Sequence, residues 1–319
     1  MASSIDSHVP VLLQPVLDGL AIRPDGTYVD ATAGRGGHAA EILARLGTDG
    51  RLILLDRDPQ AVAACQDRFR GDARVTVRHA PFSELESVLH TLEMDRVQGV
   101  LADLGVSSPQ LDQAERGFSF RQTGPLDMRM DPGRGESAAA WLARASQEEI
   151  SQVLQEYGEE RFAWRIARAI VAARSEKPLE STTELAALVA KAVPSREPGK
   201  DPATRSFQAI RMLINQELDE LGTLLDQAGS VLAPGGRLAV ISFHSLEDRM
   251  VKRFMRQGAK GHQIHPDLPI PEIQIPSAPW RLVGKAVRAD AEEVARNPRA
   301  RSAVLRIAER LDERQAGRS

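Results

Sequence analysis

The residues best suited to hold a nucleotide-like ligand lie in the stretch Thr27–His38, which reads TYVDATAGRGGH. Thr27–Val29 favours a strand, Gly34–Gly37 a turn, and Ala39–Leu46 carries apolar residues at helical spacing. Glycine has no Cβ, so the backbone of such a turn can approach a ligand closely and adopt positive φ. The start of the following helix adds free N–H donors. The stretch therefore predicts a strand, a glycine turn and a helix that together cradle a nucleotide-like ligand.

Two classes of cofactor use a turn of this kind, and the glycine spacing alone does not separate them. Gly34, Gly36 and Ala39 meet the G-x-G-x-x-A spacing of a dinucleotide site. Asp30, four positions before Gly34, instead resembles the first motif of S-adenosylmethionine (SAM) methyltransferases. In that motif a carboxylate at the strand end meets the methionine ammonium. A tight turn without any ligand is the third interpretation.

Asp56 ends a second predicted strand and is a candidate for binding a ribose. It follows the apolar run Arg51–Leu55 and lies 22 residues after Gly34, close to the roughly 20 expected for a ribose-binding acid. A carboxylate accepts the protons of both ribose hydroxyls, which favours adenosine. The alternative is a capping role, because Asp58 and Pro59 are typical of a helix start.

Asp103 is the predicted catalytic residue. It ends a strand expected over Val97–Asp103 and begins the sequence DLGVSSPQ. In the doubly wound fold, an acid at this strand end lies over the reacting centre. Amino-methyltransferases carry D-P-P-Y or N-P-P-Y there, and DLGV keeps the acid but lacks the prolines and the aromatic residue. Phe82 follows the third strand, Val75–His79, and fits either an adenine contact or a core position.

The composition bounds the class of protein. The chain has 319 residues, 42% of them hydrophobic, which supports a real core in one large or two ordinary domains. The net charge of -3 means that a nucleic-acid partner needs a local basic face. One cysteine excludes a disulfide framework and fits a reducing cytosol. With no signal peptide and no run of 18 apolar residues, we expect a cytoplasmic protein without a membrane partner. We predict no metal site.

The alternation of strands and helices stops near Leu111 and resumes with a strand over Arg237–Phe243. We therefore predict a methyltransferase-like core of residues 1–111 and 209–319, interrupted by a helical insertion of residues 112–208. A long helix is expected from Arg205 to about Ser230. Trp280–Val287 and Ser302–Ala308 are expected to form a closing hairpin. Helices inside the insertion are predicted over Ser137–Ala145, Gln147–Tyr157, Glu159–Ala173 and Thr183–Ala192.

Basic residues in the second half of the chain are candidates for contacting RNA. Arg161, Arg165 and Arg168 repeat at helical spacing and share one face, which is either a solvated surface or an RNA-facing one. Arg205 and Arg211 are added to this set as predicted phosphate ligands. Residues 296–301 form a basic loop suited to phosphates. His244, at a predicted strand end, fits a role in catalysis, in substrate contact or in capping a helix.

Several longer strings, taken together, are highly specific. They are HVPVLL at 8–13, AGRGGH at 33–38, LDRDP at 55–59, DLGVSSPQLD at 103–112, RGFSF at 116–120, GPLDMRMDP at 124–132, YGEERFA at 157–163, ISFHSLEDR at 241–249 and NPRARSA at 297–303. With these strings the sequence resembles, over nearly its whole length, the RsmH or MraW family of bacterial 16S ribosomal RNA cytosine-N4 methyltransferases.

The resemblance implies a fold, a reaction and a set of binding residues. The fold is α/β: a class I SAM-dependent methyltransferase with a doubly wound, mostly parallel seven-stranded sheet and an inserted α-helical domain. The substrate is a cytosine in the decoding region of 16S rRNA, in the small ribosomal subunit. The implied SAM contacts, which join the glycine-turn residue Gly34, are Gly36, Gly37, His38, Asp56, Phe82, Asp103 and Gln110.

Two other functions compete with this interpretation. An NAD-linked oxidoreductase is favoured only by the spacing of Gly34, Gly36 and Ala39. A non-catalytic ribosome-assembly factor with a decayed cofactor site is the other, and the three strand-end aspartates argue against decay. Whether the protein works alone or as a homodimer is left open by the sequence.

Overall fold

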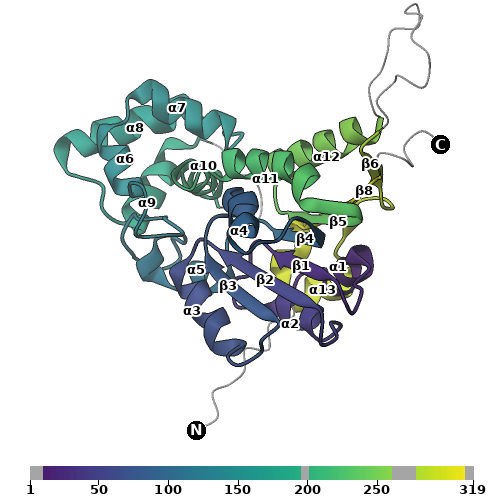
Figure 1. The fold of residues 1–319 in the computed structure, drawn as a ribbon. Helices are drawn as coiled ribbons and strands as arrows, with labels where there is room; N and C mark the ends of the chain where they lie inside the picture. Colours follow the sequence, from purple (N-terminus) through teal and green to yellow (C-terminus); the bar gives the residue numbers. More distant parts are fainter. Residues whose placement is uncertain (1–9, 195–200, 261–277, 313–319) are drawn as a thin grey trace, which may run out of the picture. The chain divides into compact units, whose positions relative to one another are not determined.

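A computed structural model of the chain describes residues 10–194, 201–260 and 278–312 (Figure 1). The first two residues of the HVPVLL string lie outside this part. The chain forms two compact units: Met1–Gly105 with Asp219–Ser319, and Val106–Leu218. The predicted insertion of residues 112–208 lies within the second unit, which begins earlier and ends later than the sequence pattern indicated.

The first unit is built on one twisted sheet, whose strands follow the order β3-β2-β1-β4-β5-β8-β6. The first five of these strands are parallel, and β8 is antiparallel to its neighbours β5 and β6. This confirms the predicted doubly wound, mostly parallel fold. The parallel strands are β1 (Thr27–Asp30), β2 (Arg51–Asp56), β3 (Val75–His79), β4 (Val97–Asp103) and β5 (Leu232–Ser242).

Helices cover both faces of the sheet, and the strand sequences reflect it. Alternate residues of a strand point to opposite faces. Leu52 and Leu54 enter one core with helices α1 (Leu13–Leu20), α2 (Gly37–Leu43) and α3 (Pro59–Arg68). Ile53 and Leu55 enter the other with α4 (Leu85–Thr91), α11 (Glu217–Val231) and α12 (Ser245–Lys260). Burial on both sides explains why β2 is a continuous apolar run.

The antiparallel edge differs in detail from the predicted hairpin. Instead of one strand over Trp280–Val287, the structure has β6 (Trp280–Leu282) and β7 (Val287–Arg288), and both pair with β8 (Val304–Arg310). Gly284, with a φ of +69°, lies between the two short strands and interrupts the extended conformation. Among the described residues the sheet thus has eight strands, seven of them on the path across it.

The basic stretch 296–301 was predicted as a loop, but most of it is helical. It contains the end of helix α13 (Ala291–Arg296) and most of a 3₁₀ helix over Pro298–Ser302. Asp290 caps α13 by accepting from the Glu293 N–H, and Asn297 caps the 3₁₀ helix. These two caps stabilise short helical segments in a stretch that we expected to be irregular.

The second unit is helical around its own core. It contains α5 (Ser108–Asp112), α6 (Ala138–Arg144), α7 (Gln147–Glu156), α8 (Ala163–Glu176), α9 (Thr182–Ala192) and α10 (Thr204–Ile214). The predicted helices of the insertion are confirmed within a few residues. Ile150, Ile166 and Leu185 are fully buried where α7, α8 and α9 meet. Ser146 and Glu149 form a capping box at the start of α7.

The long helix predicted from Arg205 to about Ser230 is wrong. The chain leaves helical geometry at Asn215, and Gln216 has a φ of +51°, so α10 and α11 are separate helices. The side chain of Asn215 explains the break, because it bonds to the loop around Met128 instead of facing solvent. Within the described residues, no helix has the length and apolar character needed to cross a membrane.

Candidate cofactor and active site

The glycine turn between β1 and α2 has the predicted conformation. Gly34 and Gly36 have φ values of +53° and +75°, which only glycine adopts without strain. A Cβ on Gly36 would lie 2.6 Å from the Phe69 ring, so this glycine is required by packing. A Cβ on Gly34 would meet nothing closer than 4.0 Å. Open space therefore lies beside Gly34, where the backbone can approach a ligand.

Asp56, at the end of β2, fastens the glycine turn. Its Oδ2 accepts from the Gly34 N–H at 2.8 Å, and its Oδ1 accepts from the Asp58 N–H at 2.8 Å. Burial raises the pKa of this carboxyl to about 6. The N-cap of α3 is Asp58, whose Oδ1 accepts from the Gln60 N–H, and not Asp56; the contact of Asp56 to Gly34 was not foreseen. Each oxygen keeps a second lone pair that can accept a ligand hydroxyl.

Asp30 and Asp103 end the neighbouring strands β1 and β4 and are linked through Thr32. Asp30 is 1% exposed, and its Oδ1 accepts from the Thr32 N–H at 3.2 Å. The Thr32 hydroxyl in turn accepts from the Asp103 N–H at 2.6 Å. Burial raises the pKa of Asp30 to about 7. Thr32 was missed by sequence reasoning, since a lone threonine in a turn carries no signal of this role.

The carboxyl of Asp103 is poorly compensated. Burial raises the pKa of Asp103 well above the usual range, and the nearby carboxyls of Asp30 and Glu247 raise it further. Its side chain is a quarter exposed, but Oδ1 is buried and has no hydrogen-bond partner among the described residues. A buried polar atom without a partner is costly, and such atoms are found at functional sites.

His38 lies beside Asp103 and is neutral. Its Nε2 lies 3.0 Å from the carbonyl oxygen of Val11, which can only accept, so Nε2 carries the proton. Its Nδ1, with a lone pair, lies 3.7 Å from Oδ2 of Asp103. Burial lowers the pKa of His38 to about 4. The pair is therefore not a salt bridge, and at 3.7 Å the two side chains are not hydrogen-bonded to each other.

Two further predicted cofactor residues have structural partners in this structure. Phe82, in a 3₁₀ turn after β3, is half-buried and packs against the core that contains Leu85. Gln110 belongs to the second unit, and its side chain completes a capping box with Ser107 at the start of α5. Their predicted contacts to the cofactor stay predictions.

The interpretation of His244 as a helix cap agrees with its contacts. Its Nδ1 faces the Glu247 N–H at 3.4 Å. Oε2 of Glu247 accepts from the backbone N–H groups of Phe243 and His244, at 2.9 and 3.4 Å. The two side chains thus hold the start of α12 in the manner of a reciprocal cap. The spacing of three between His244 and Glu247 was the signal available in the sequence.

Cys65 is unsuited to nucleophilic chemistry. It is fully buried on α3, and its thiol donates to the carbonyl oxygen of Gly34 at 3.3 Å. Burial raises the pKa of this thiol to about 12, so the thiolate is scarcely populated at neutral pH. Cys65 therefore stabilises the glycine turn through this hydrogen bond.

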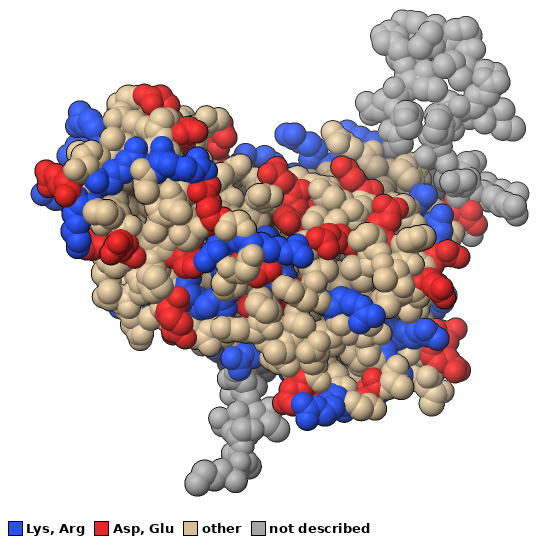
Figure 2. Space-filling view, turned by 60° about the vertical axis from the view of Figure 1, so that its left-hand side comes forward, with Lys and Arg blue, Asp and Glu red and all other residues tan. Residues whose placement is uncertain are grey.

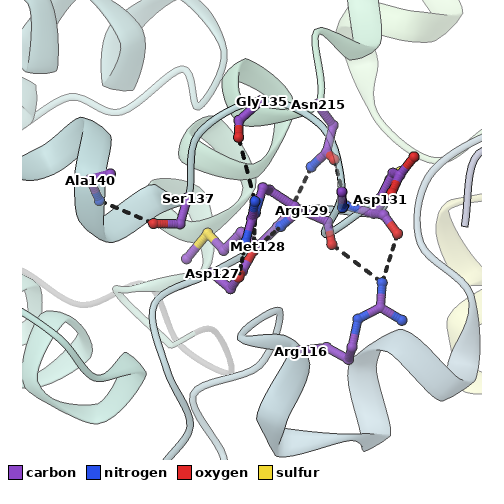
Figure 3. A network of polar contacts seen from close by, with 11 residues as sticks. Arg116, Asp127, Met128, Arg129, Asp131, Gly135, Ser137, Ala140 and Asn215 are labelled. Carbon is purple, nitrogen blue, oxygen red and sulfur yellow. Dashed lines mark hydrogen bonds and ion pairs between the residues drawn. The ribbon is translucent and has the colours of Figure 1, made fainter.

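The GPLDMRMDP string of the second unit forms a tightly bonded loop (Figure 3). The Nδ2 of Asn215 donates to the carbonyl of Met128 at 2.7 Å, and its Oδ1 accepts from the Met130 N–H at 2.8 Å. Arg116 donates to the carbonyl of Met130 at 2.8 Å. Met128 has a φ of +62°, a conformation that this network must hold in place.

Comparison with known proteins connects these features to one family. The model of the MraW methylase family matches residues 6–311. The chain is 60% identical over 307 residues to the ribosomal RNA small subunit methyltransferase H of Thiobacillus denitrificans, covering 96% of this chain and 98% of that protein. It is 60% identical over 306 residues to the methyltransferase of the same name from Thioalkalivibrio sulfidiphilus, with the same coverage.

Among solved structures, an rRNA methylase from Streptococcus thermophilus aligns with a TM-score of 0.43 at 11% identity, covering 96% of this chain and 100% of that chain. The family model spans the strands that carry Asp30, Asp56 and Asp103 and also the whole helical unit. The chain therefore belongs to the MraW methylase family.

Proposed function

We propose that this protein transfers a methyl group from SAM to the exocyclic N4 of a cytosine in the decoding region of 16S rRNA, within the small ribosomal subunit. Membership in the family makes it a SAM-dependent rRNA methyltransferase. The base, the atom and the region are the proposal. The observation that carries it is the Asp103 carboxyl, which ends β4 with one buried oxygen unpartnered among the described residues.

The residues around the glycine turn fit SAM. The open side of Gly34 admits a ligand against the backbone, and Asp56 keeps lone pairs for the ribose hydroxyls. Asp30 and Asp103 supply two carboxyls whose raised pKa values fall when a cation binds nearby, which suits a ligand with an ammonium and a sulfonium group. When bound, SAM supplies an electrophilic methyl group.

Direct transfer to an amine is the chemistry that these side chains support. The N4 lone pair of cytosine is delocalised into the ring, so an acceptor for the amino protons is needed to make the nitrogen nucleophilic. The Asp103 carboxylate is that acceptor, and the carbonyl of Leu104 is the second. In the transfer, the N–C bond would form as the bond between the methyl carbon and the sulfonium sulfur breaks, its electron pair staying on the sulfur of the departing thioether; the amine would lose a proton, and Asp103 is the base that would receive it. The cytosine must leave its stack to reach this position.

Methylation at cytosine C5 requires a different chemistry. It needs a cysteine thiolate that attacks C6 and activates the ring. Cys65, the single cysteine of the chain, is buried, donates to Gly34 and has a pKa of about 12. The methylase family also decides against the NAD-linked oxidoreductase that the glycine spacing left open.

Two substitutions test the mechanism. Cys65→Ser should methylate ribosomal subunits at the parent rate, because no covalent step uses the thiol. Asp103→Ala should lose at least about two orders of magnitude in rate, the scale of one preorganised polar group. The measurement is the initial rate of methyl transfer from labelled SAM at saturating cofactor. A folded, SAM-binding Cys65→Ser protein without activity would overturn direct transfer, and an inactive parent would favour the assembly factor.

The same proposal assigns the helical unit of residues 106–218 to recognition of the RNA and places the enzyme in the cytoplasm, where ribosomal subunits are assembled. Of the predicted phosphate ligands, Arg211 is already paired with Glu217 through two contacts of 2.7 and 2.8 Å. Its charge is therefore neutralised within the unit, and we assign the phosphate contacts to other arginines.

A further inference from the structure

Helix α8 carries an unusual outer surface. Trp164 is 54% exposed, the larger exposure of the two large apolar side chains that are exposed in the described part of the chain. Arg165 and Arg168 on α8 are exposed as well, at the spacing that places them on the same side of the helix as Trp164, and Arg161 is exposed in the turn just before the helix. We call these four residues the α8 face. Basic side chains gather on parts of the helical unit's surface (Figure 2).

The three arginines of the α8 face are not engaged within the protein. No hydrogen bond or ion pair joins any of them to another residue in the described part of the chain. Four other arginines of the same unit are bonded to a carboxylate or a carbonyl: Arg129 to Asp127, Arg144 to Glu136, Arg174 to Leu142 and Arg211 to Glu217. The side chain of the exposed Arg121 resembles the α8 face in having no such bond in the described part of the chain. The charges of the α8 face are thus available to an external anion.

The start of α8 differs from the starts of α7 and α9 and resembles that of α10, which also lacks a side-chain cap and an acidic residue in its first turn. Helices α7 and α9 begin with capping boxes and with acidic residues in the first turn. Helix α8 has neither a side-chain cap nor an acidic residue there, and Arg165 lies in its first turn. A cation near a helix N-terminus is unfavourable for the helix itself. Arg165 therefore contributes nothing favourable to the start of its own helix.

The indole ring is also uncovered. The cation–π contacts of the described residues join Arg68 to Phe69 and Arg116 to Phe118, and none of them uses Trp164. An exposed indole with exposed arginines at neighbouring positions matches the two needs of single-stranded nucleic acid, a stacking surface for a base and cations for the phosphates. We infer that the α8 face binds an unpaired stretch of RNA, with one base stacked on Trp164 and the flanking phosphates on Arg161, Arg165 and Arg168.

This inference rests on the proposed function, since it concerns the same RNA substrate. The α8 face is nevertheless far in sequence from Asp103, the proposed base of the methyl transfer. Stacking is tolerant of sequence because every base has a π-face. We therefore expect the α8 face to hold the strand and not to select the target base.

Tryptophan fluorescence tests the contact in the full-length protein. The chain has three tryptophans, and Trp141 and Trp280 are only 6% and 4% exposed. Adding an oligouridylate of about twelve nucleotides, a typical single-strand site size, should quench the emission of Trp164. Quenching that appears on concentrating the protein without RNA would instead show self-association and overturn the inference.

Substitutions separate stacking from general surface effects. With labelled oligouridylate, Trp164→Ala and Trp164→Leu should weaken binding roughly five- to hundredfold, while Trp164→Phe retains most of the affinity. Leu282→Ala, at the other exposed large apolar side chain, is the matched control and should bind as the parent does. Equal affinity of Trp164→Ala and parent would refute the stacking contact.

Salt dependence tests the arginines. Changing Arg161, Arg165 and Arg168 to Gln should reduce the slope of log affinity against log salt by about 0.7 for each lost phosphate contact. SAM affinity should stay unchanged. An unchanged slope would mean that the three arginines form a solvated surface. Methylation of ribosomal subunits by the parent, assayed in parallel, reports on the proposed function separately from these binding results.

Discussion

Three aspartates at strand ends carry the proposed binding of SAM: Asp30, Asp56 and Asp103. All three end parallel strands, and burial raises the pKa of each. Such positions are unfavourable for a protein without a ligand, because a buried charge is stabilised only by partners. Their retention together at one edge of the sheet agrees with binding of a cationic cofactor.

Asp56 is the residue whose loss should most directly affect cofactor binding. Asp56→Ala removes the predicted acceptor of the ribose hydroxyls and also releases the Gly34 N–H. Because hydrogen bonds to a charged group contribute about 1.5–3 kcal/mol, SAM affinity should fall roughly tenfold or more in calorimetry. Asp67→Ala, at an exposed acid on α3, is the control. Unchanged affinity in a folded Asp56→Ala protein would contradict the assignment.

Asp30 should give the protein a distinct dependence of stability on pH. Its pKa is about 7 in the folded chain and 3.8 ordinarily, so the folded state holds the proton more tightly. Its contribution to stability is therefore complete below about pH 4 and is lost as pH rises through 7, by at most about 1.4 kcal/mol per pH unit.

Asp30→Asn keeps an acceptor for the Thr32 N–H but cannot ionise. The difference in unfolding free energy between Asp30→Asn and the parent should grow in favour of the variant between pH 5 and 8, in urea titrations without SAM. A difference that does not change with pH would show that Asp30 ionises as it does in the unfolded chain.

For single residues, the sequence predicted the positions of the candidate site residues better than it predicted their hydrogen-bond partners. The strand-end aspartates follow apolar runs, so their placement is encoded locally. The bond from Asp56 to Gly34, the Thr32 bridge and the capping role of Gln110 depend on chain segments that meet only in the folded protein.

Among the elements, the glycine turn and the Asn215 junction show where local pattern suffices and where it fails. The glycine turn could be predicted because its residues are consecutive in the sequence, and its positive φ angles at Gly34 and Gly36 are ones that glycine adopts easily. The helical spacing of apolar residues continues from α10 into α11, so nothing local marks the break. What ends α10 is a set of hydrogen bonds from Asn215 to a loop some 85 residues earlier.

Asn215→Ala should loosen this junction. The residue is 1% exposed, and its loss leaves the Met130 N–H and the Met128 carbonyl unsatisfied. Each orphaned buried group costs about 1–3 kcal/mol. Hydrogen exchange by mass spectrometry should therefore show faster exchange over residues 124–132.

Gln155→Ala, at an exposed position of α7, is the control and should leave that loop unchanged. Protection of residues 124–132 at the parent level in Asn215→Ala would mean that the other contacts of the loop, such as those of Arg116 and the backbone bond from Leu126 to Glu180, hold it without Asn215.

For the whole molecule, the pattern of strands and helices was sufficient to predict the α/β class and an interruption of it. The sequence placed the interruption at residues 112–208, whereas the structure groups 106–218 as one unit. The difference arises because the ends of the unit are defined by tertiary contacts, such as those of Asn215, and not by a change of composition. The eighth strand was missed because Gly284 divides the stretch predicted as one strand, Trp280–Val287, into β6 and the two-residue β7.

The central claim is that this protein methylates N4 of a cytosine in small-subunit rRNA. The most direct measurement is to incubate it with small ribosomal subunits and labelled SAM, digest the RNA to nucleosides and identify the labelled product by mass spectrometry against standards. We expect N4-methylcytidine from the parent and from Cys65→Ser, and little from Asp103→Ala. A 5-methylcytidine product, or label on another base, would contradict it.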